Sequence, residues 1–260
     1  MMPFIQADGA QIYCKLEGPD EAPALVLLNS IGTDMDLWAL MLPRLRERFR
    51  LLRIDTRGHG ASDAPGGDYS LAMLADDVFA AMDAYDIARA SVAGVSLGGM
   101  IAMEMALARP IRVQRLALVC TSATMDPLAW DARVATVRTR GMAAIADLAM
   151  GRFLSAEFIA ANPASTATVR RQLITMAAEG YAGCAAAIRD MDIAPRLGDI
   201  GCPTLVVTGD RDVSTPHDGH GEHLVGGIGM TRHVVLPTGH LAPLEMPDAL
   251  SDALLTFFQD

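Results

Sequence analysis

Several features common in other classes of protein are scarce in this chain. It holds one lysine, Lys15, and its charges sum to −10 at pH 7. A surface that is negative overall repels phosphate groups, so we expect neither nucleic acid nor an anionic membrane as a partner. No uninterrupted apolar run approaches the roughly 20 residues that a membrane-spanning helix needs. The composition favours a small-molecule partner and is compatible with a monomer or a small homo-oligomer.

Cysteines are also few, and none lies near another in the sequence. Long stretches separate the four, without a C-x-x-C motif: Cys14, Cys120, Cys184 and Cys202. Three of them lie in apolar stretches. We interpret all four as reduced, buried thiols of a cytoplasmic protein. The first residues lack the basic and apolar regions of a signal peptide, in agreement with that location.

Apolar sequence, in contrast, is abundant. Hydrophobic residues make up 51% of the 260 residues, which is enough for one large domain with a sizeable core. Short apolar runs alternate with helical patterns along most of the chain. This alternation predicts an α/β fold with a mostly parallel sheet covered by helices on both faces.

The expected elements follow from these patterns. The strands are 4–6 and 11–16, which form a hairpin, then 24–28, 50–55, 89–95, 113–120, 203–209 and 232–237. The helices are 35–47, 71–85, 97–108 and 247–258. Ser70 is the expected cap of the second helix, with Asp76 and Asp77 on its wet face.

The alternation stops in the middle of the chain. Residues 122–194 contain no convincing strand, and their alanine-rich helical pattern is broken at Gly141, Asn162-Pro163 and Gly180. We therefore expect a helical cap at 122–194, inserted into an α/β core made of 1–121 and 195–260. Such a cap would cover a site at the carboxyl edge of the sheet, where ligands bind in α/β folds.

The most informative stretch is Gly94-Val-Ser-Leu-Gly98. It matches the pattern G-x-S-x-G and joins a strand-like run to a strong helix former. In a nucleophile elbow of this kind, the serine occupies a sharp turn and its hydroxyl projects clear of the backbone. Side chains at Gly94 and Gly98 would crowd the close approach of strand and helix. Ser96 is therefore the candidate nucleophile; the alternative is a glycine-rich turn that merely contains a serine.

A serine nucleophile needs a base and an acid that orients the base. After an elbow, the acid and then the histidine follow on loops after late strands. His240 comes directly after the last expected strand, so we assign it as the base. Two acids follow the strand that ends at Gly209, and we prefer Asp212, further into the loop, over Asp210. Asp126 is another alternative.

Two backbone amides are expected to stabilise the oxyanion. One belongs to Leu97, where the start of a helix points free N–H groups at the reacting carbonyl. The other is expected in the loop 29–32, with Ile31 as the donor. His59 lies in the turn Arg57-Gly-His-Gly60 and is expected to shape that loop.

Three further histidines, His217, His220 and His223, form the pattern H-x-x-H-x-x-H. The pattern fits either a metal site or a polar, exposed segment after a strand. Because no cysteine or well-spaced carboxylate completes a ligand set, we favour the exposed segment. We expect neither a metal nor an organic cofactor.

These residues together resemble α/β-hydrolases over essentially the whole chain, and among them the 3-oxoadipate enol-lactonases of bacterial aromatic catabolism. The similar stretches are the elbow and residues 29–38, 53–62, 180–192 and 206–216. The pair Asn29-Ser30, where many relatives carry His-Gly, and the segment Ile188-Arg-Asp190 narrow the resemblance to the lactonases. It implies an α/β-hydrolase fold and the triad Ser96, Asp212 and His240.

The resemblance also implies a reaction. Those enzymes open a small enol-lactone bearing one free carboxylate, through an acyl-enzyme that would form here on Ser96, and they use no cofactor. An acidic protein needs a local cation to hold that carboxylate. Trp130 and Arg133 share one face of an expected helix. We hypothesise that Arg133 binds the carboxylate and Trp130 packs against the ring; the alternative is a surface arginine beside a core tryptophan.

Other functions are compatible with the same residues. A small-ester carboxylesterase, a cofactor-free perhydrolase or a C–C bond hydrolase would keep the Ser96 chemistry and change the substrate. A hydrolase-fold binding protein would close its cap on a ligand without turnover. For any of the enzymes, activity is expected to fall in acid, when His240 takes up a proton.

Overall fold

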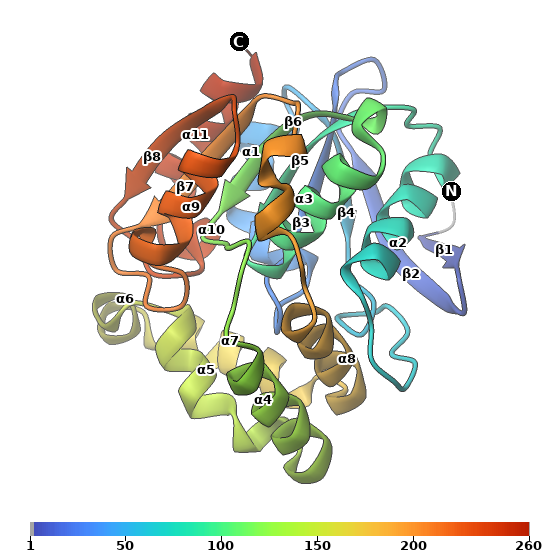
Figure 1. Cartoon of the computed structure of the whole chain (residues 1–260). Coiled ribbons are helices and arrows are strands. Elements are labelled where there is room, and N and C mark those ends of the chain that lie inside the picture. Colours follow the sequence, from blue (N-terminus) through green and yellow to red (C-terminus); the bar gives the residue numbers. More distant parts are fainter. Residues whose placement is uncertain (1–2, 260) are drawn as a thin grey trace.

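The computed structural model describes residues 3–259, and one eight-stranded sheet forms its centre (Figure 1). The strand order is β1-β2-β4-β3-β5-β6-β7-β8. The β1–β2 and β2–β4 pairs are antiparallel, and all later neighbours are parallel. The strands are β1 (Phe4–Ala7), β2 (Ala10–Glu17), β3 (Ala24–Leu28), β4 (Arg50–Ile54), β5 (Ala90–Val95), β6 (Val113–Val119), β7 (Thr204–Gly209) and β8 (Thr231–Leu236). The predicted α/β fold with a mostly parallel sheet is confirmed.

Helices cover both faces of this sheet (Figure 1). Helix α2 (Leu71–Ala84) packs against α3 (Leu97–Ala108) on one face, and α1 (Leu42–Leu45) packs against α11 (Pro247–Gln259) on the other. The shorter pieces are η1 (Met35–Met41), η2 (Pro110–Arg112), η4 (Ala194–Asp199), η5 (His217–Gly221), α9 (Glu222–Gly227) and α10 (Ala242–Glu245). Strand β5 is buried along its whole length, so the turn that follows it lies over the centre of the sheet.

Two expectations about helices on the core were wrong. The pattern over 35–47 forms the 3-10 helix η1 and a single α-helical turn, α1, with Pro43 in the first turn of α1. In α2, Ser70 caps the helix as predicted, by accepting from the Met73 amide. Asp77 of α2, however, is buried and not exposed to solvent. Its burial is possible because both of its carboxylate oxygens accept from Arg57, at 2.6 and 2.8 Å.

Five α-helices follow β6 and lie together beyond the carboxyl ends of the strands (Figure 1). They are α4 (Pro127–Arg140), α5 (Ala146–Phe153), α6 (Ala156–Ala161), α7 (Pro163–Thr175) and α8 (Ala178–Arg189), with the 3-10 turn η3 (Met142–Ala144) between α4 and α5. We call residues 122–194 the cap segment. Helices end at Gly141 and Asn162, as predicted, but the break expected at Gly180 was wrong, because this glycine lies inside α8.

All four cysteines are free thiols. Cys14, Cys120 and Cys184 are buried as expected, whereas Cys202 is only partly buried. Burial raises the pKa of the Cys14 thiol to about 12, so it stays protonated. No helix within residues 3–259 is long and apolar enough to cross a membrane.

Candidate active site

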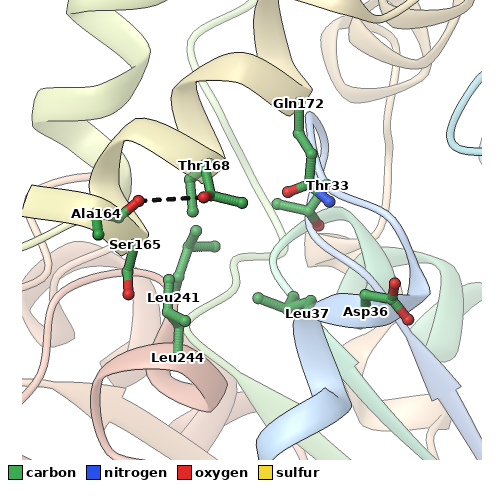
Figure 2. Close-up of a pocket in the computed structure, with 10 residues that line it drawn as sticks. Thr33, Asp36, Leu37, Ala164, Ser165, Thr168, Gln172, Leu241 and Leu244 are labelled. Atoms are coloured by element: carbon green, nitrogen blue, oxygen red, sulfur yellow. Dashed lines mark hydrogen bonds between the residues drawn. The ribbon is translucent and has the colours of Figure 1, made fainter. Parts of the chain in front are cut away.

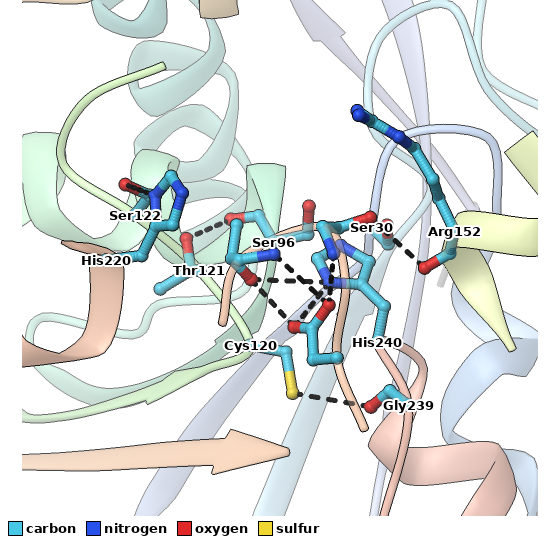
Figure 3. A network of polar contacts seen from close by, with 12 residues as sticks. Ser30, Ser96, Cys120, Thr121, Ser122, Arg152, His220, Gly239 and His240 are labelled. Atoms are coloured by element: carbon cyan, nitrogen blue, oxygen red, sulfur yellow. Dashed lines mark hydrogen bonds and ion pairs between the residues drawn. The ribbon is translucent and has the colours of Figure 1, made fainter. Parts of the chain in front are cut away.

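Ser96 occupies the turn between β5 and α3 in a backbone conformation that is rare for a residue with a side chain. Its φ is 54° and its ψ is −118°. Such a conformation costs of order 1–3 kcal/mol and persists only where surrounding contacts hold it. Two contacts with the end of β6 do so here. The Ser96 amide donates to Val119 O at 3.0 Å, and Thr121 Oγ1 donates to Ser96 O at 2.6 Å (Figure 3).

The glycines beside Ser96 are required by close packing of backbone. A Cβ atom at Gly94 would lie 2.2 Å from Gly98 O, and a Cβ at Gly98 would lie 2.5 Å from Leu28 O. A Cβ at Gly99 would meet the Thr121 side chain at 2.6 Å. The strand, the turn and the helix can therefore approach each other only without side chains at these positions.

Asp212 and His240 come from the loops after β7 and β8, and the structure brings them into contact. His240 Nδ1 lies 2.9 Å from Asp212 Oδ2, and both residues are 3% exposed. Asp212 also accepts from the Ser214 amide at 2.8 Å and from Thr215 Oγ1 at 2.8 Å. Because Nδ1 donates to the carboxylate, Nε2 of His240 keeps the lone pair that accepts a proton.

The charge state of Asp212 follows from these contacts. Burial by itself raises the pKa of this carboxyl, but the facing His240 and the hydrogen bonds from His240, Ser214 and Thr215 outweigh it and lower the pKa to about 2. Asp212 is thus ionised at neutral pH. The alternative acids are engaged elsewhere: Asp210 pairs with Arg211 at 3.7 Å, and Asp126 accepts from the Leu128 amide at 2.9 Å to cap α4.

A buried histidine, His59, fixes the loop after β3 by a hydrogen bond. The Gly32 amide donates to His59 Nε2 at 3.0 Å, and His59 Nδ1 lies 3.2 Å from Arg57 O. Burial lowers the pKa of His59 to about 4, so the ring is neutral and Nε2 can accept. His59 therefore shapes the loop that carries Ile31 as well as its own. Within the described residues, the Ile31 amide has no acceptor of its own.

Helix α3 begins at Leu97, so the amide of Leu97 has no acceptor within the helix. Leu97 directly follows Ser96 and is fully buried. Ile31 lies with Ser96 at the wall of one cavity. Both residues thus lie close to the candidate nucleophile, and their role as oxyanion donors stays a prediction.

That cavity is small and lies between the sheet and the cap segment. Its volume is about 20 Å³, room for about one water molecule. Ser96 and His240 line its floor, and the cap segment supplies the opposite wall. The remaining lining residues are Ile31, Met100, Met125, Trp130, Arg133, Arg152, Phe153, Ser214 and Thr215.

Trp130 and Arg133 share one face of α4, as expected, and both line this cavity. The Arg133 guanidinium carbon lies 4.6 Å from the centre of the Trp130 ring, in a cation–π contact. Trp130 is 7% exposed. Arg133 is half-buried, and its role as a carboxylate ligand stays a prediction.

Several cavity residues escaped the sequence analysis. Thr215 bridges to both Asp212 Oδ2 and His240 Nδ1, at 2.8 and 3.4 Å. The Phe153 ring stacks against the His240 ring, with 6.3 Å between centres. Only the proximity of Thr215 to the acid in sequence could have signalled a role. Nothing in the sequence links Phe153 to a histidine 87 positions later, since their contact depends on how the cap folds back.

The three spaced histidines do not converge. His217 stacks on His233 of β8 with 4.6 Å between ring centres, while His220 Nδ1 contacts Ser122 Oγ at 2.8 Å (Figure 3). In the part of the chain that the structure describes, no group of three or more histidine, cysteine or acidic side chains could hold a metal ion. His220 instead joins η5 to the start of the cap segment.

A larger groove lies beside the small cavity, between α7 and the core (Figure 2). Its volume is about 400 Å³, and its walls include Thr168 and Gln172 of α7, Leu37 of η1, and Leu241, the neighbour of His240. The groove does not contain Ser96 or His240 among its lining residues. Ser96 and the imidazole thus line the small cavity and not this groove.

Comparison with known proteins places this geometry in a family. A family model described as the alpha/beta hydrolase fold matches residues 23–247. The chain belongs to the α/β-hydrolase fold family. This α/β-hydrolase is 34% identical to "3-oxoadipate enol-lactonase 2" of Acinetobacter baylyi over 239 residues, which cover 91% of this chain and 89% of that protein.

Two further relatives are similar to this chain over most of its length. The crystal structure of the enol-lactonase from Burkholderia xenovorans LB400 matches this α/β-hydrolase with a TM-score of 0.96 and 34% identity, covering 99% of this chain and 100% of that one. A "putative carbamate hydrolase RutD" of Agrobacterium fabrum is 27% identical over 257 residues, 91% of this chain and 93% of that protein. The family and these relatives make the chain a hydrolase.

Proposed function

We propose that this chain is a cytoplasmic serine hydrolase that opens a small, carboxylate-bearing enol-lactone. The proposed substrate is 3-oxoadipate enol-lactone, which yields 3-oxoadipate in aromatic catabolism. The observation that carries the proposal is the lining of one cavity, which includes Ser96, His240 and the cation Arg133. At about 20 Å³ the cavity holds only about one water molecule, so the proposal requires cap side chains to move aside when the lactone binds. The enol-lactonases among the relatives support the choice of a lactone over other esters.

In this proposal Ser96 is the nucleophile, His240 the base and Asp212 the group that orients the base. His240 takes the Ser96 proton, and Ser96 Oγ attacks the lactone carbonyl. The amides of Ile31 and Leu97 donate to the oxyanion. The leaving group is an enolate, which departs more readily than an alkoxide, so ring opening needs little acid assistance. His240 returns the Ser96 proton to the enolate oxygen as the C–O bond of the lactone breaks. It then takes a proton from a water molecule, whose oxygen attacks the acyl-enzyme carbonyl, and gives that proton to Ser96 Oγ as the product leaves.

The carboxylate of the substrate is bound on the cap side. Arg133 donates to it, and the Trp130 ring orients Arg133 and packs against the lactone. No metal or cofactor takes part in the proposed reaction. Because the pKa of Asp212 is lowered to about 2, its carboxylate stays ionised down to strongly acid pH and remains available to orient the base.

The test is hydrolysis of 3-oxoadipate enol-lactone, followed by ultraviolet absorbance, with wild type and Ser96→Ala in parallel. Wild type is expected to turn the lactone over with a high kcat/KM. Ser96→Ala is expected to lose at least about 10³-fold in kcat, as nucleophile removal does in serine hydrolases. Circular dichroism of Ser96→Ala controls for folding.

Other outcomes separate the alternatives. Cleavage of p-nitrophenyl acetate through Ser96 without lactone turnover would refute the lactonase and leave a small-ester hydrolase or a perhydrolase, the latter recognised by turnover with peroxide. Binding of the lactone by the wild type, without turnover of any substrate, would instead identify a hydrolase-fold binding protein.

A further inference from the structure

A second arginine, Arg152, faces the same cavity as Arg133. It comes from the last turn of α5, whereas Arg133 comes from α4; both residues line the cavity, and Arg152 is itself exposed. The backbone of Arg152 is fixed, because Ser214 Oγ donates to Arg152 O at 3.1 Å. Its side chain extends away from His240, on the cap side of the cavity (Figure 3).

These two arginines lack the acidic partners that about half of the arginines in the described residues have. Arg57 pairs with Asp77, Arg189 with three aspartates and Arg138 with Asp68. Within residues 3–259, neither Arg133 nor Arg152 forms an ion pair, and the guanidinium of Arg152 forms no hydrogen bond. In a protein of net charge −10, two unpaired cations at one cavity leave a local positive potential that an anion would satisfy.

Tyr181 of α8 lies behind this pair. Its side chain is fully buried, and Arg133 Nη1 donates to its hydroxyl oxygen at 3.4 Å. Burial raises the pKa of the Tyr181 phenol, while the positive charges of Arg133 and Arg152 act on it in the opposite direction. Trp130 on one side and Tyr181 on the other thus fix the plane of the Arg133 guanidinium.

We propose that Arg152 is a second specificity-determining residue, which shares the substrate carboxylate with Arg133, and that Tyr181 positions Arg133 for this task. A carboxylate has two oxygens and about four acceptor sites, so it can accept from two guanidinium groups at once. The site would select small acyl compounds with a carboxylate at the end remote from the scissile bond. This inference rests on the proposed function for the identity of the substrate. The part that assigns a carboxylate to the two arginines does not rest on it.

The experiment compares two p-nitrophenyl esters that differ in one charge. Mono-p-nitrophenyl succinate carries a terminal carboxylate, and p-nitrophenyl butyrate is its neutral counterpart. Arg152→Gln is expected to reduce kcat/KM for the succinate ester by about 10- to 100-fold, mostly through KM, which is the range for loss of a hydrogen bond to a charged group. kcat/KM for the butyrate ester is expected to stay within about twofold of wild type.

One control variant and two further variants test this interpretation. Arg140→Gln removes the same charge from an exposed position at the end of α4 and is expected to leave both esters unaffected. In a double-mutant cycle with Arg133→Gln, the two losses are expected to be less than additive if one carboxylate contacts both arginines. Tyr181→Phe is expected to weaken the succinate ester alone, with a smaller effect than Arg133→Gln.

Two results would overturn the inference. Equal losses on both esters would make Arg152 a structural residue, and no loss on the succinate ester would remove it from the carboxylate site. Failure of the proposed function looks different. An Arg152-dependent preference for the succinate ester, without turnover of the enol-lactone, would sustain the two-arginine site and reject only the lactone.

Discussion

Two helices of the cap segment, α7 and α8, have similar lengths but contact the core in opposite ways. Nine of the twelve residues of α8 are buried, whereas α7 buries only Val169 and Leu173 among its thirteen. Within the described residues, one side-chain hydrogen bond joins α7 to the core, from Gln172 Nε2 to Asp34 Oδ2 at 2.8 Å. The cap is therefore not one uniform lid, because α8 is built into the core while α7 rests on it.

Glycine explains why α8 can come so close. A Cβ at Gly180 would lie 2.4 Å from the Gly58 Cα, and a Cβ at Gly183 would lie 2.7 Å from the Tyr69 ring. The Tyr69 amide also donates to Gly183 O at 3.1 Å, so the helix backbone itself bonds to the core. Helix α8 also contacts one residue of the cavity wall, because Arg133 donates to the hydroxyl of Tyr181 at 3.4 Å.

Among the variants that test the difference between α7 and α8, Gly180→Ala is expected to lower the stability of the protein most. The added methyl meets backbone rather than a movable side chain, which costs about 3 kcal/mol, and the better helix propensity of alanine returns about 1 kcal/mol. We expect the free energy of unfolding, measured with urea, to fall by about 2 kcal/mol. Gly151→Ala in α5 is the control, since a Cβ there meets nothing within 4 Å and stability is expected to rise. Equal shifts in both variants would contradict the contrast.

An intermediate loss of stability is expected for Glu245→Gln, because Glu245 joins the cap segment to the loop of His240. Glu245 accepts from the Ser155 amide and the Ser155 hydroxyl, both at 2.7 Å, and from the Gly239 amide at 3.0 Å. Glu245→Gln places an NH₂ group against these donors and is expected to cost about 1.5 kcal/mol. Because Gly239 precedes His240, kcat is expected to fall as well. Unchanged stability and kcat, measured by urea unfolding and ester hydrolysis, would show that Glu245 does not tie the two parts together.

The smallest effect on stability is expected for Gln172→Ala, which removes the bond between α7 and Asp34. An exposed or half-buried hydrogen bond contributes about 0.5–1 kcal/mol, so global unfolding is expected to shift by no more than that. Amide hydrogen exchange is expected to quicken along α7 and to stay unchanged along α8, since local opening follows local contacts. Faster exchange in both helices would mean that the cap opens as one body.

Sequence reasoning succeeded where local chemistry decides structure. The elbow could be predicted because Gly94, Ser96 and Gly98 lie within one turn, and the contact between Asp212 and His240 could be expected because each follows a late strand. It failed where the structural role of a glycine or an acidic residue depends on a contact with a residue far away in the sequence. Gly180 looked like a helix break because its reason, Gly58, lies 122 positions earlier.

Asp77 and Arg152 show the same limit. Asp77 looked exposed because aspartate on a helix is usually solvated, and only Arg57, brought close by the hairpin and the loop after β4, makes its burial possible. Arg152 carries no local pattern at all. Its place at the cavity depends on how α5 packs over the loops of Asp212 and His240, which propensity and spacing do not encode.

The strained turn at Ser96 has a consequence for how such a protein changes over generations. Its φ of 54° is a conformation that glycine adopts without penalty, so the fold is expected to be more stable with glycine in place of this proposed nucleophile. Stability and activity are thus opposed at a single position. A lineage released from selection for turnover gains by losing its serine first, which would leave the sheet, the cap and the cationic cavity intact for a descendant that binds its ligand without reacting with it.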